Sequence, residues 1–315
     1  MSMQTSGYSE RLMQARTAHG VAAAAALEKP AGSRPDAALL GRRWRETLVA
    51  LLQIPSAVLG GLVVLFWALC AVFWPLLAPY NPTIPDYTHA LARPSLAHLA
   101  GTDPFGRDVL SRVLAGSRQV LILAPTATAI GLTGGILIGL LTAYYGGWLD
   151  DILSRVMEAI MAFPLIIIAL TVLFMFGASP LNTILVIGIA YVPLVSRVVR
   201  AAAMSVRDLD YVSAARLRGA RGPEIMLTEI LPNISGPVAV EATVRIGYAI
   251  FTIASLSFIG LGTGPDSTDW GSMLYALKDY LPIDPWMVLA PALAIASLVV
   301  ALNLLADGLR QATRA

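Results

Sequence analysis

"YVSAARLRGARGPEIMLTEILPN", residues 211–233, is a polar segment between two long apolar stretches. Charged side chains crowd into this segment and the residues just before it: Arg207, Asp208, Asp210, Arg216, Arg218, Arg221, Glu224 and Glu229. Because only 13% of the chain is charged, such a cluster indicates a segment outside the apolar environment of its neighbours. The interpretation of the fold and of the function depends on what this segment contacts.

The 315-residue chain has the composition of an integral membrane protein. It is 57% hydrophobic, with a mean hydropathy of +0.70, and it has far fewer charged residues than the about 25% of soluble domains. A net charge of +2 does not indicate a nucleic-acid partner. The single Cys70 lies in an apolar run and excludes an intrachain disulfide. His19, His89 and His98 lack metal-ligand spacing, so we expect no metal site.

The N-terminal residues differ from the rest of the chain. They are rich in Ala, Ser, Gly and charge, and their only apolar run, residues 21–27, is mostly alanine. A signal peptide needs a stronger apolar core. We therefore expect a disordered tail over residues 1–46, followed by a membrane domain over residues 47–315.

Six stretches are long and apolar enough to cross a bilayer, which takes roughly 20 residues of helix. They cover residues 57–78, 120–145, 156–176, 181–199, 237–261 and 285–305. Several contain proline, which a span tolerates where neighbouring groups satisfy the freed carbonyls. The sequence therefore predicts an all-α membrane protein with six transmembrane helices.

The distribution of basic residues predicts the orientation. Six spans place both termini on one side, together with Arg155 and the arginines between residues 197 and 221. The opposite side holds Arg93, Arg107, Arg112, Arg118 and Lys278. The positive-inside bias places the first set, both termini and residues 204–233 in the cytoplasm.

The first part of this cytoplasmic segment is predicted to be a short helix. Asp208 can cap it, and Leu209, Val212 and Ala215 share one face. Gly219 is a natural helix stop.

A second helix is expected after Gly222, with Pro223 at an early position and Glu224 at its positive end. Its apolar side would be Met226, Leu227, Ile230 and Leu231, and Pro232 would end it. The pattern alone leaves two interpretations open: a helical hairpin that enters a cleft of a partner, or an amphipathic connector on lipid headgroups.

This segment resembles the cytoplasmic EAA loop of ABC-importer permeases. Ser213-Ala214-Ala215, Gly219 and Ile230-Leu231-Pro232 match its pattern in order, with Ser213 where the family usually has Glu. The resemblance implies that this segment is a coupling helix that docks an ATPase. The residues it assigns to coupling are Asp210, Tyr211, Ser213, Ala214, Ala215, Arg216, Gly219, Ala220, Leu231 and Pro232.

Five further stretches are similar, in order, to the C-type permeases of dipeptide, oligopeptide and nickel importers. They are GTDPFGRDVLSRVLAGSR (residues 101–118), YYGGWLDD (144–151), LSFIGLG (256–262), WGSML (270–274) and NLLADGLR (303–310). Ala306 stands where a Gly is common. The resemblance covers about residues 50–312 and implies the type I ABC-importer permease fold in a bacterial cytoplasmic membrane.

The resemblance implies that this chain forms half of a translocation path for short peptides, or for nickel or another small solute. The expected partners are a B-type permease, two ATPase subunits or one fused ATPase, and an external solute-binding protein. ATP and Mg would be bound by the ATPases and no cofactor by this chain. In agreement, the sequence has no G-x-x-x-x-G-K-[ST] loop, and its only lysines are Lys29 and Lys278.

Glu241 and Arg245 form a possible ion pair early in the fifth predicted span. One interpretation is a charged gate on the translocation path, because intramembrane charges usually face a cavity. The other is a pair near the cytoplasmic interface, with Arg245 reaching toward it. The loops 79–118 and 263–284 are candidate docking surfaces for the binding protein, and "RDVLSRVLAGSR" within the first predicts an interfacial helix.

Two rival functions belong to other classes. An ion-coupled secondary transporter would show unwound half-helices in corresponding spans, and the sequence shows none. An intramembrane enzyme would need a convergent site, but the chain has no H-E-x-x-H, no G-x-S-x-G and no histidine in any predicted span. We therefore expect no catalytic residue in this chain.

Overall fold

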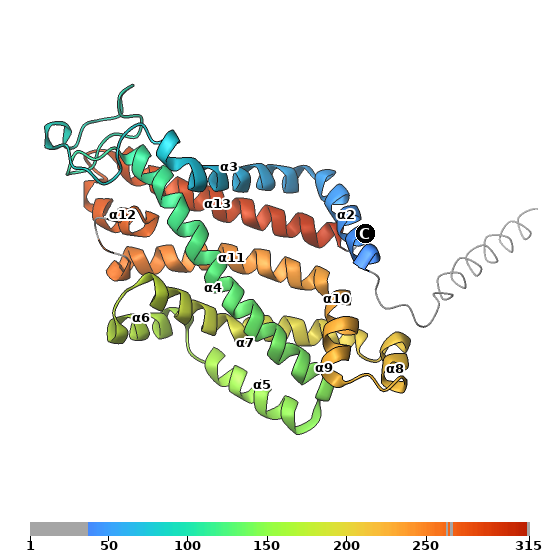
Figure 1. The fold of residues 1–315 in the computed structure, drawn as a ribbon. Coiled ribbons are helices and arrows are strands. Elements are labelled where there is room, and N and C mark those ends of the chain that lie inside the picture. Colours follow the sequence, from blue (N-terminus) through green and yellow to red (C-terminus); the bar gives the residue numbers. More distant parts are fainter. Residues whose placement is uncertain (1–36, 263, 265–266, 314–315) are drawn as a thin grey trace, which may run out of the picture.

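The computed structural model describes residues 37–262, 264 and 267–313, and all regular structure in these residues is helical (Figure 1). The α-helices are α2 (Ala37–Leu52), α3 (Pro55–Leu77), α4 (Val109–Tyr145), α5 (Gly147–Met161), α6 (Leu165–Phe176), α7 (Pro180–Val206), α8 (Asp210–Leu217), α9 (Gly222–Glu224), α10 (Leu231–Asn233), α11 (Ser235–Leu256), α12 (Trp270–Leu277) and α13 (Pro285–Ala312). Two π-helical stretches, η2 (Ile225–Ile230) and η3 (Ser257–Leu261), and two 3-10 turns, η1 (Tyr87–His89) and η4 (Lys278–Tyr280), complete the set.

Five of the described helices are long and apolar enough to cross a membrane, namely α3, α4, α7, α11 with its continuation η3, and α13. The stretch predicted as one span over residues 156–176 is bent at its middle. It belongs to α5 and α6, which meet at an angle of 77°. Pro164 stands directly before α6, and a proline has no N–H to continue the helix before it. Counting this bent pair as one span gives six.

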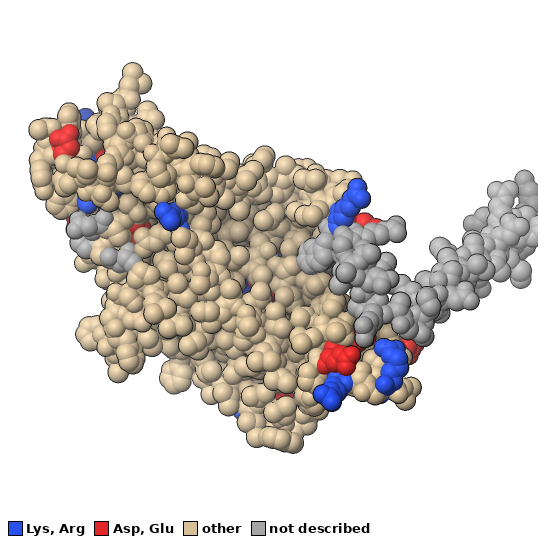
Figure 2. All heavy atoms as spheres, in the orientation of Figure 1, with Lys and Arg blue, Asp and Glu red and all other residues tan. Residues whose placement is uncertain are grey.

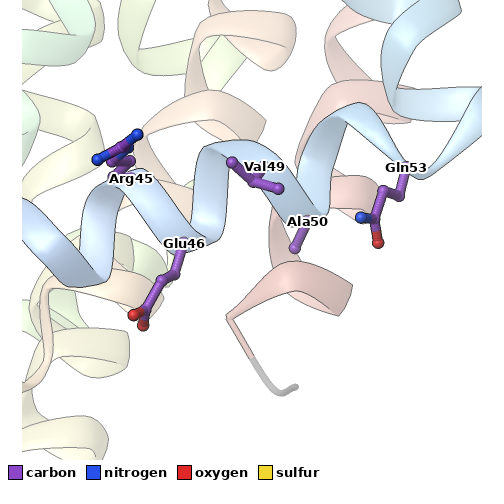
Figure 3. A pocket seen from close by; sticks show the side chains of 5 residues that line it. All are labelled: Arg45, Glu46, Val49, Ala50 and Gln53. Atoms are coloured by element: carbon purple, nitrogen blue, oxygen red, sulfur yellow. The ribbon is translucent and has the colours of Figure 1, made fainter.

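The last ten residues of the predicted N-terminal tail are helical instead of disordered. α2 begins at Ala37, inside the range 1–46, and the rest of the predicted tail lies outside the described residues. Leu48, Val49 and Leu52 of α2 are exposed. Arg45, Glu46, Val49, Ala50 and Gln53 line an open hollow of about 400 Å³ (Figure 3). Four of these residues belong to α2 and Gln53 directly follows it. The hollow is therefore part of the surface of this helix and not an enclosed site.

The long helices are arranged side by side (Figure 1). α3, α13, α11 and α7 form a layer in that order, and α4 crosses this layer with its most extensive contact to α7. Glycines of α4 allow this approach: a Cβ on Gly139 would lie 2.7 Å from the Cβ of Val199. Small residues that let two backbones approach closely are typical of helix pairs in membranes.

The polar connections lie at the two ends of the layer. The loop before α4 and the helix α12 lie at one end, and α8, α9 and α10 lie at the other (Figure 1). Figure 2 shows charged side chains gathered toward these ends, with a broad, largely uncharged band between them. This distribution matches a bundle that spans a bilayer.

Candidate functional site

The segment between α7 and α11 begins with α8, and its start differs from the prediction. Leu209, not Asp208, is the residue before the first turn, and its side chain makes no capping hydrogen bond. The Asp208 carboxylate accepts a hydrogen bond from Nε of Arg207 at 3.2 Å. The prediction that Asp208 caps the helix is therefore wrong. Asp210 is exposed in the first turn, where a negative charge favours the helix.

The end of α8 confirms the role of Gly219 as the helix stop. Gly219 has a φ of 79°, and its N–H donates to the carbonyl of Arg216 at 3.0 Å. The N–H of Ala220 donates to the carbonyl of Ala215 at 3.1 Å. This pair of hydrogen bonds is a Schellman motif, which needs a residue with positive φ at the position of Gly219.

The second half of the segment is helical but not a regular α-helix. α9 starts with Gly222 and Pro223 as predicted, then η2 adopts the wider π pattern, and α10 follows. Pro232 has no N–H for a regular i to i−4 bond, which fits the irregular turns before it. In this geometry Met226 and Ile230 are buried, as predicted, but Leu227 is exposed. Its expected place on the apolar side is therefore wrong.

One face of α8 packs inside this chain. Val212 and Ala215 lie in a buried cluster with Ile225, Met226 and Ile230 of the second half, and with Leu140, Val195 and Val199 of α4 and α7. Ala215 is only 1% exposed. It cannot form a surface contact in this conformation, so the expectation that it contacts an ATPase is corrected to a packing role.

Polar contacts attach the segment to the ends of α4 and α7. The guanidinium of Arg216 lies 5.2 Å from the ring centre of Tyr144. Nη1 of Arg207 donates to the carbonyl of Ala143 at 2.6 Å. A Cβ on Gly222 would lie 2.6 Å from the hydroxyl of Tyr145. The segment is therefore a packed part of the bundle and not a loose connector.

The outer face of the segment is an exposed strip, here called the docking strip. It consists of Asp210, Ser213, Arg216, Leu217, Arg218, Gly219, Arg221 and Leu227. The other predicted coupling residues, Tyr211, Ala214, Ala220, Leu231 and Pro232, are half-buried behind it. Leu217 is 90% exposed between two arginines, and sequence reasoning missed it. The signal was present, because an apolar residue between two charges at a helix end falls outside the Leu209–Val212–Ala215 face.

Glu241 and Arg245 do meet, on α11. Nε of Arg245 donates to Oε1 of Glu241 at 2.6 Å. The guanidinium also lies 5.6 Å from the ring centre of Tyr191 on α7 and 5.7 Å from that of Tyr248. The structure thus brings both predicted gate residues together at the α7–α11 contact.

The two loops predicted to be external form one cap. Nη2 of Arg112 donates to the carbonyl of Ser267 at 2.8 Å, and the indole N–H of Trp270 donates to the carbonyl of Val113 at 2.9 Å. Residues 109–118 are the first turns of α4, and Val109 and Val113 in them are buried. The predicted helix is present and leads into the second span, but Val109 and Val113 of its apolar side pack against protein.

The cap also contains a buried charge cluster and an exposed turn. Nε of Arg107 donates to the Asp103 carboxylate at 2.7 Å, and both are buried. In the turn, hydrogen bonds from the side chains of Thr88 and His89 hold the pKa of Asp86 down at about 2. Among the described residues no group of three or more His, Cys, Asp or Glu could hold a metal ion.

Comparisons with known proteins agree with this architecture. The family model described as "binding-protein-dependent transport system inner membrane component" matches residues 135–315. The model described as "N-terminal TM domain of oligopeptide transport permease C" matches residues 42–94.

Curated relatives cover most of the chain. It is 35% identical to a dipeptide transport system permease protein of Alkalihalophilus pseudofirmus over 85% of this chain and 88% of the relative. It is 37% identical to a glutathione transport system permease protein of Pectobacterium atrosepticum over 85% and 90%. A solved chain of the MetNI methionine ABC transporter, in an inward-facing conformation, is 17% identical. It matches with a TM-score of 0.53 over 64% of this chain and 96% of its own length, which shows a shared fold.

Proposed function

Because the chain belongs to the family of binding-protein-dependent transport system inner membrane components, we propose that it is one of two permease subunits of an ATP-driven importer of short peptides. The family membership supports the proposed class of transport. The names of the relatives support the proposed class of solute. The two curated relatives are named as permeases for dipeptides and for glutathione. The fold is that of an ABC-importer permease.

The docking strip supports a partner on the cytoplasmic side. It presents Leu217 between Arg216 and Arg218, while the opposite face of α8 is fixed by the Val212 and Ala215 contacts. An exposed apolar side chain within a charged rim is typical of a protein contact. The partner proposed here is the ATPase, which would bind ATP and Mg in place of this chain.

The packing of the segment supports a rigid transmission of motion. α8 and η2 share one buried cluster with α4 and α7, so displacement of the docking strip would move the inner ends of those helices with it. Closure of paired ATPases would then bias the bundle between two arrangements, one open to each side. In this scheme the chain contributes no catalytic group.

The remaining partners follow from the same proposal. A B-type permease would pair with this chain to complete the path, and a solute-binding protein would deliver the peptide to the external cap. Both termini and the docking strip would lie in the cytoplasm of a bacterial cell, because the basic residues concentrate on that side.

The experiment that tests this function is reconstitution. The chain, co-expressed with a second permease, the ATPases and the binding protein, should co-purify with them and import a labelled dipeptide into proteoliposomes only with ATP. The chain alone should hydrolyse no ATP. Uptake of nickel but not of peptides, or uptake that follows an ion gradient without ATP, would contradict the proposal.

A further inference from the structure

The arginine of the ion pair on α11 makes one hydrogen bond and lies near two tyrosine rings. Arg245 donates from Nε to a single oxygen of Glu241, although a guanidinium carries five N–H groups. Its two Nη groups make no hydrogen bond to any residue that the structure describes. The side chains of Arg245 and Glu241 are 16% and 12% exposed, so the pair is enclosed but still accessible from one side.

A second arginine of the same chain binds a carboxylate with two edges of its guanidinium. Arg200 on α7 donates from Nε to Oδ1 of Asp150 at 2.8 Å and from Nη2 to Oδ2 at 2.6 Å. This bidentate geometry is the strong one for an arginine and a carboxylate. Arg200 thus uses both edges of its guanidinium on one carboxylate, whereas Arg245 uses only Nε in a hydrogen bond.

Arg245 combines an ion pair inside a predicted span with exposed aromatic neighbours. Arg245 is the eleventh residue of α11, about 15 Å along the helix axis, and charged groups inside a span usually face a cavity or a bundle interior. Tyr248 and Phe251, about one and two turns farther along α11, are 56% and 58% exposed. The hydroxyl of an intramembrane tyrosine favours a polar partner or water over hydrocarbon. These residues form a face that starts with a cation and continues with aromatic rings.

From this arrangement, and on the basis of the proposed peptide-import function, we infer that Arg245 binds a carboxylate of the passing peptide through its Nη edge. The rings of Tyr248 and Phe251 contact the peptide's neighbouring side chains. Glu241 holds the guanidinium in place and offsets part of its charge. The carboxylate is therefore held weakly enough to be released, which transport requires.

The test compares peptides that differ only in their carboxylates. The reconstituted complex would receive labelled trialanine as the free acid and as the C-terminal amide, in wild type and in Arg245→Gln. The loss of charged hydrogen bonds should reduce uptake of the free acid about ten-fold and uptake of the amide less than about two-fold. Because the same binding protein delivers each peptide to both complexes, its own preference cancels in the variant-to-wild-type ratio.

Two further variants separate recognition from a structural role of the pair. Arg245→Lys keeps the charge but loses the planar fork, so it should restore only part of the free-acid uptake. Glu241→Gln removes a competing negative charge and should lower KM for the free acid. A purely structural pair would instead be damaged by either substitution.

A third peptide, C-amidated Ala-Glu-Ala, identifies which carboxylate is bound. If Arg245→Gln reduces its uptake like that of the free acid, Arg245 binds any carboxylate; if not, it binds the chain terminus alone. An equal loss of free-acid and amide uptake in Arg245→Gln, with normal membrane levels, would overturn the inference. If the wild-type complex imports no peptide at all, the proposed function itself has failed, and the inference that rests on it fails too.

Discussion

Arg200 on α7 and Asp150 on α5 form two parallel hydrogen bonds, 2.8 Å and 2.6 Å long. This contact attaches the first half of the bent third span to α7, the helix that leads into α8. Arg200→Gln should therefore loosen α5 and lower the free energy of unfolding by about 1 kcal/mol, since the pair is partly exposed. The shift is measured as a lower Tm of the detergent-solubilised protein. The exchanged pair Arg200→Asp with Asp150→Arg should recover part of it, and no recovery would contradict a direct interaction.

Leu217 is the most exposed apolar residue of the docking strip, at 90%. Leu217→Asp should leave the fold intact, because the side chain contacts little of its own chain, and should weaken ATPase binding by more than about 1 kcal/mol. Co-purification of the ATPases with the tagged permease measures this effect. Leu96→Asp is the matched control, since Leu96 lies in the loop before α4, at the opposite end of the bundle, and is 99% exposed. Equal ATPase recovery with both variants would remove the docking strip from the interface.

Gly219 allows a test of backbone conformation without a steric clash. A Cβ at Gly219 would meet no atom within 4 Å, and the same is true of Gly61 in α3, but only Gly219 has a positive φ. Gly219→Ala should therefore cost about 1 kcal/mol, whereas Gly61→Ala should be neutral or stabilising in its helix. Thermal unfolding of both variants decides the point. Equal Tm shifts would show that the conformation of Gly219 is not what matters.

Ala215→Arg should act through folding before it acts on any partner. The side chain points into the cluster of Val212, Ile225 and Ile230, where a long charged group finds no room. We expect lower membrane levels and a lower Tm, with a loss of several kcal/mol of stability. Ser213 lies two residues earlier, on the exposed face of the same helix. Ser213→Arg should therefore keep normal membrane levels and a normal Tm. A normal Tm for Ala215→Arg would contradict the inward packing of this helix.

The orientation is tested with single cysteines. After Cys70→Ala, a cysteine at the exposed Ser213 should react with a membrane-impermeant thiol reagent only from the cytoplasmic side. One at Leu96 should react only from outside. Labelling of intact cells and of inverted vesicles distinguishes the two, and the reverse pattern would invert the proposed topology.

The turn at Asp86 offers a test of pH dependence with a defined sign. The pKa of Asp86 is lowered to about 2, mainly by the hydroxyl of Thr88 and then by His89. A lowered pKa means that the ionised carboxylate stabilises the turn above the unfolded pKa of about 4. That contribution is lost as the pH falls through about 2. A carboxyl resonance of Asp86 that titrates near 4 in the folded protein would contradict these hydrogen bonds.

Local sequence signals predicted much of this structure. Long apolar runs located the spans, and Gly219 marked the end of α8 because a left-handed residue after a helix is a local requirement. The predictions that were wrong concern residues whose burial depends on contacts between distant segments. Ala215 and Leu227 were assigned to the wrong surfaces because their burial depends on how η2 packs against α4 and α7. The Arg112–Ser267 contact joins residues far apart in sequence, and no local pattern encodes it.

The length of α4 has a mechanical consequence. Its 37 residues extend about 55 Å as a single rod, from the cap contact of Val113 with Trp270 to the contact of Tyr144 with Arg216. A rod that pivots near its middle by about 10° displaces each end by about 5 Å in opposite directions. α4 would then act as a lever between the two faces of the membrane. Force applied at either face would be felt at the other, so delivery of solute outside and closure of the ATPases inside would each favour the other.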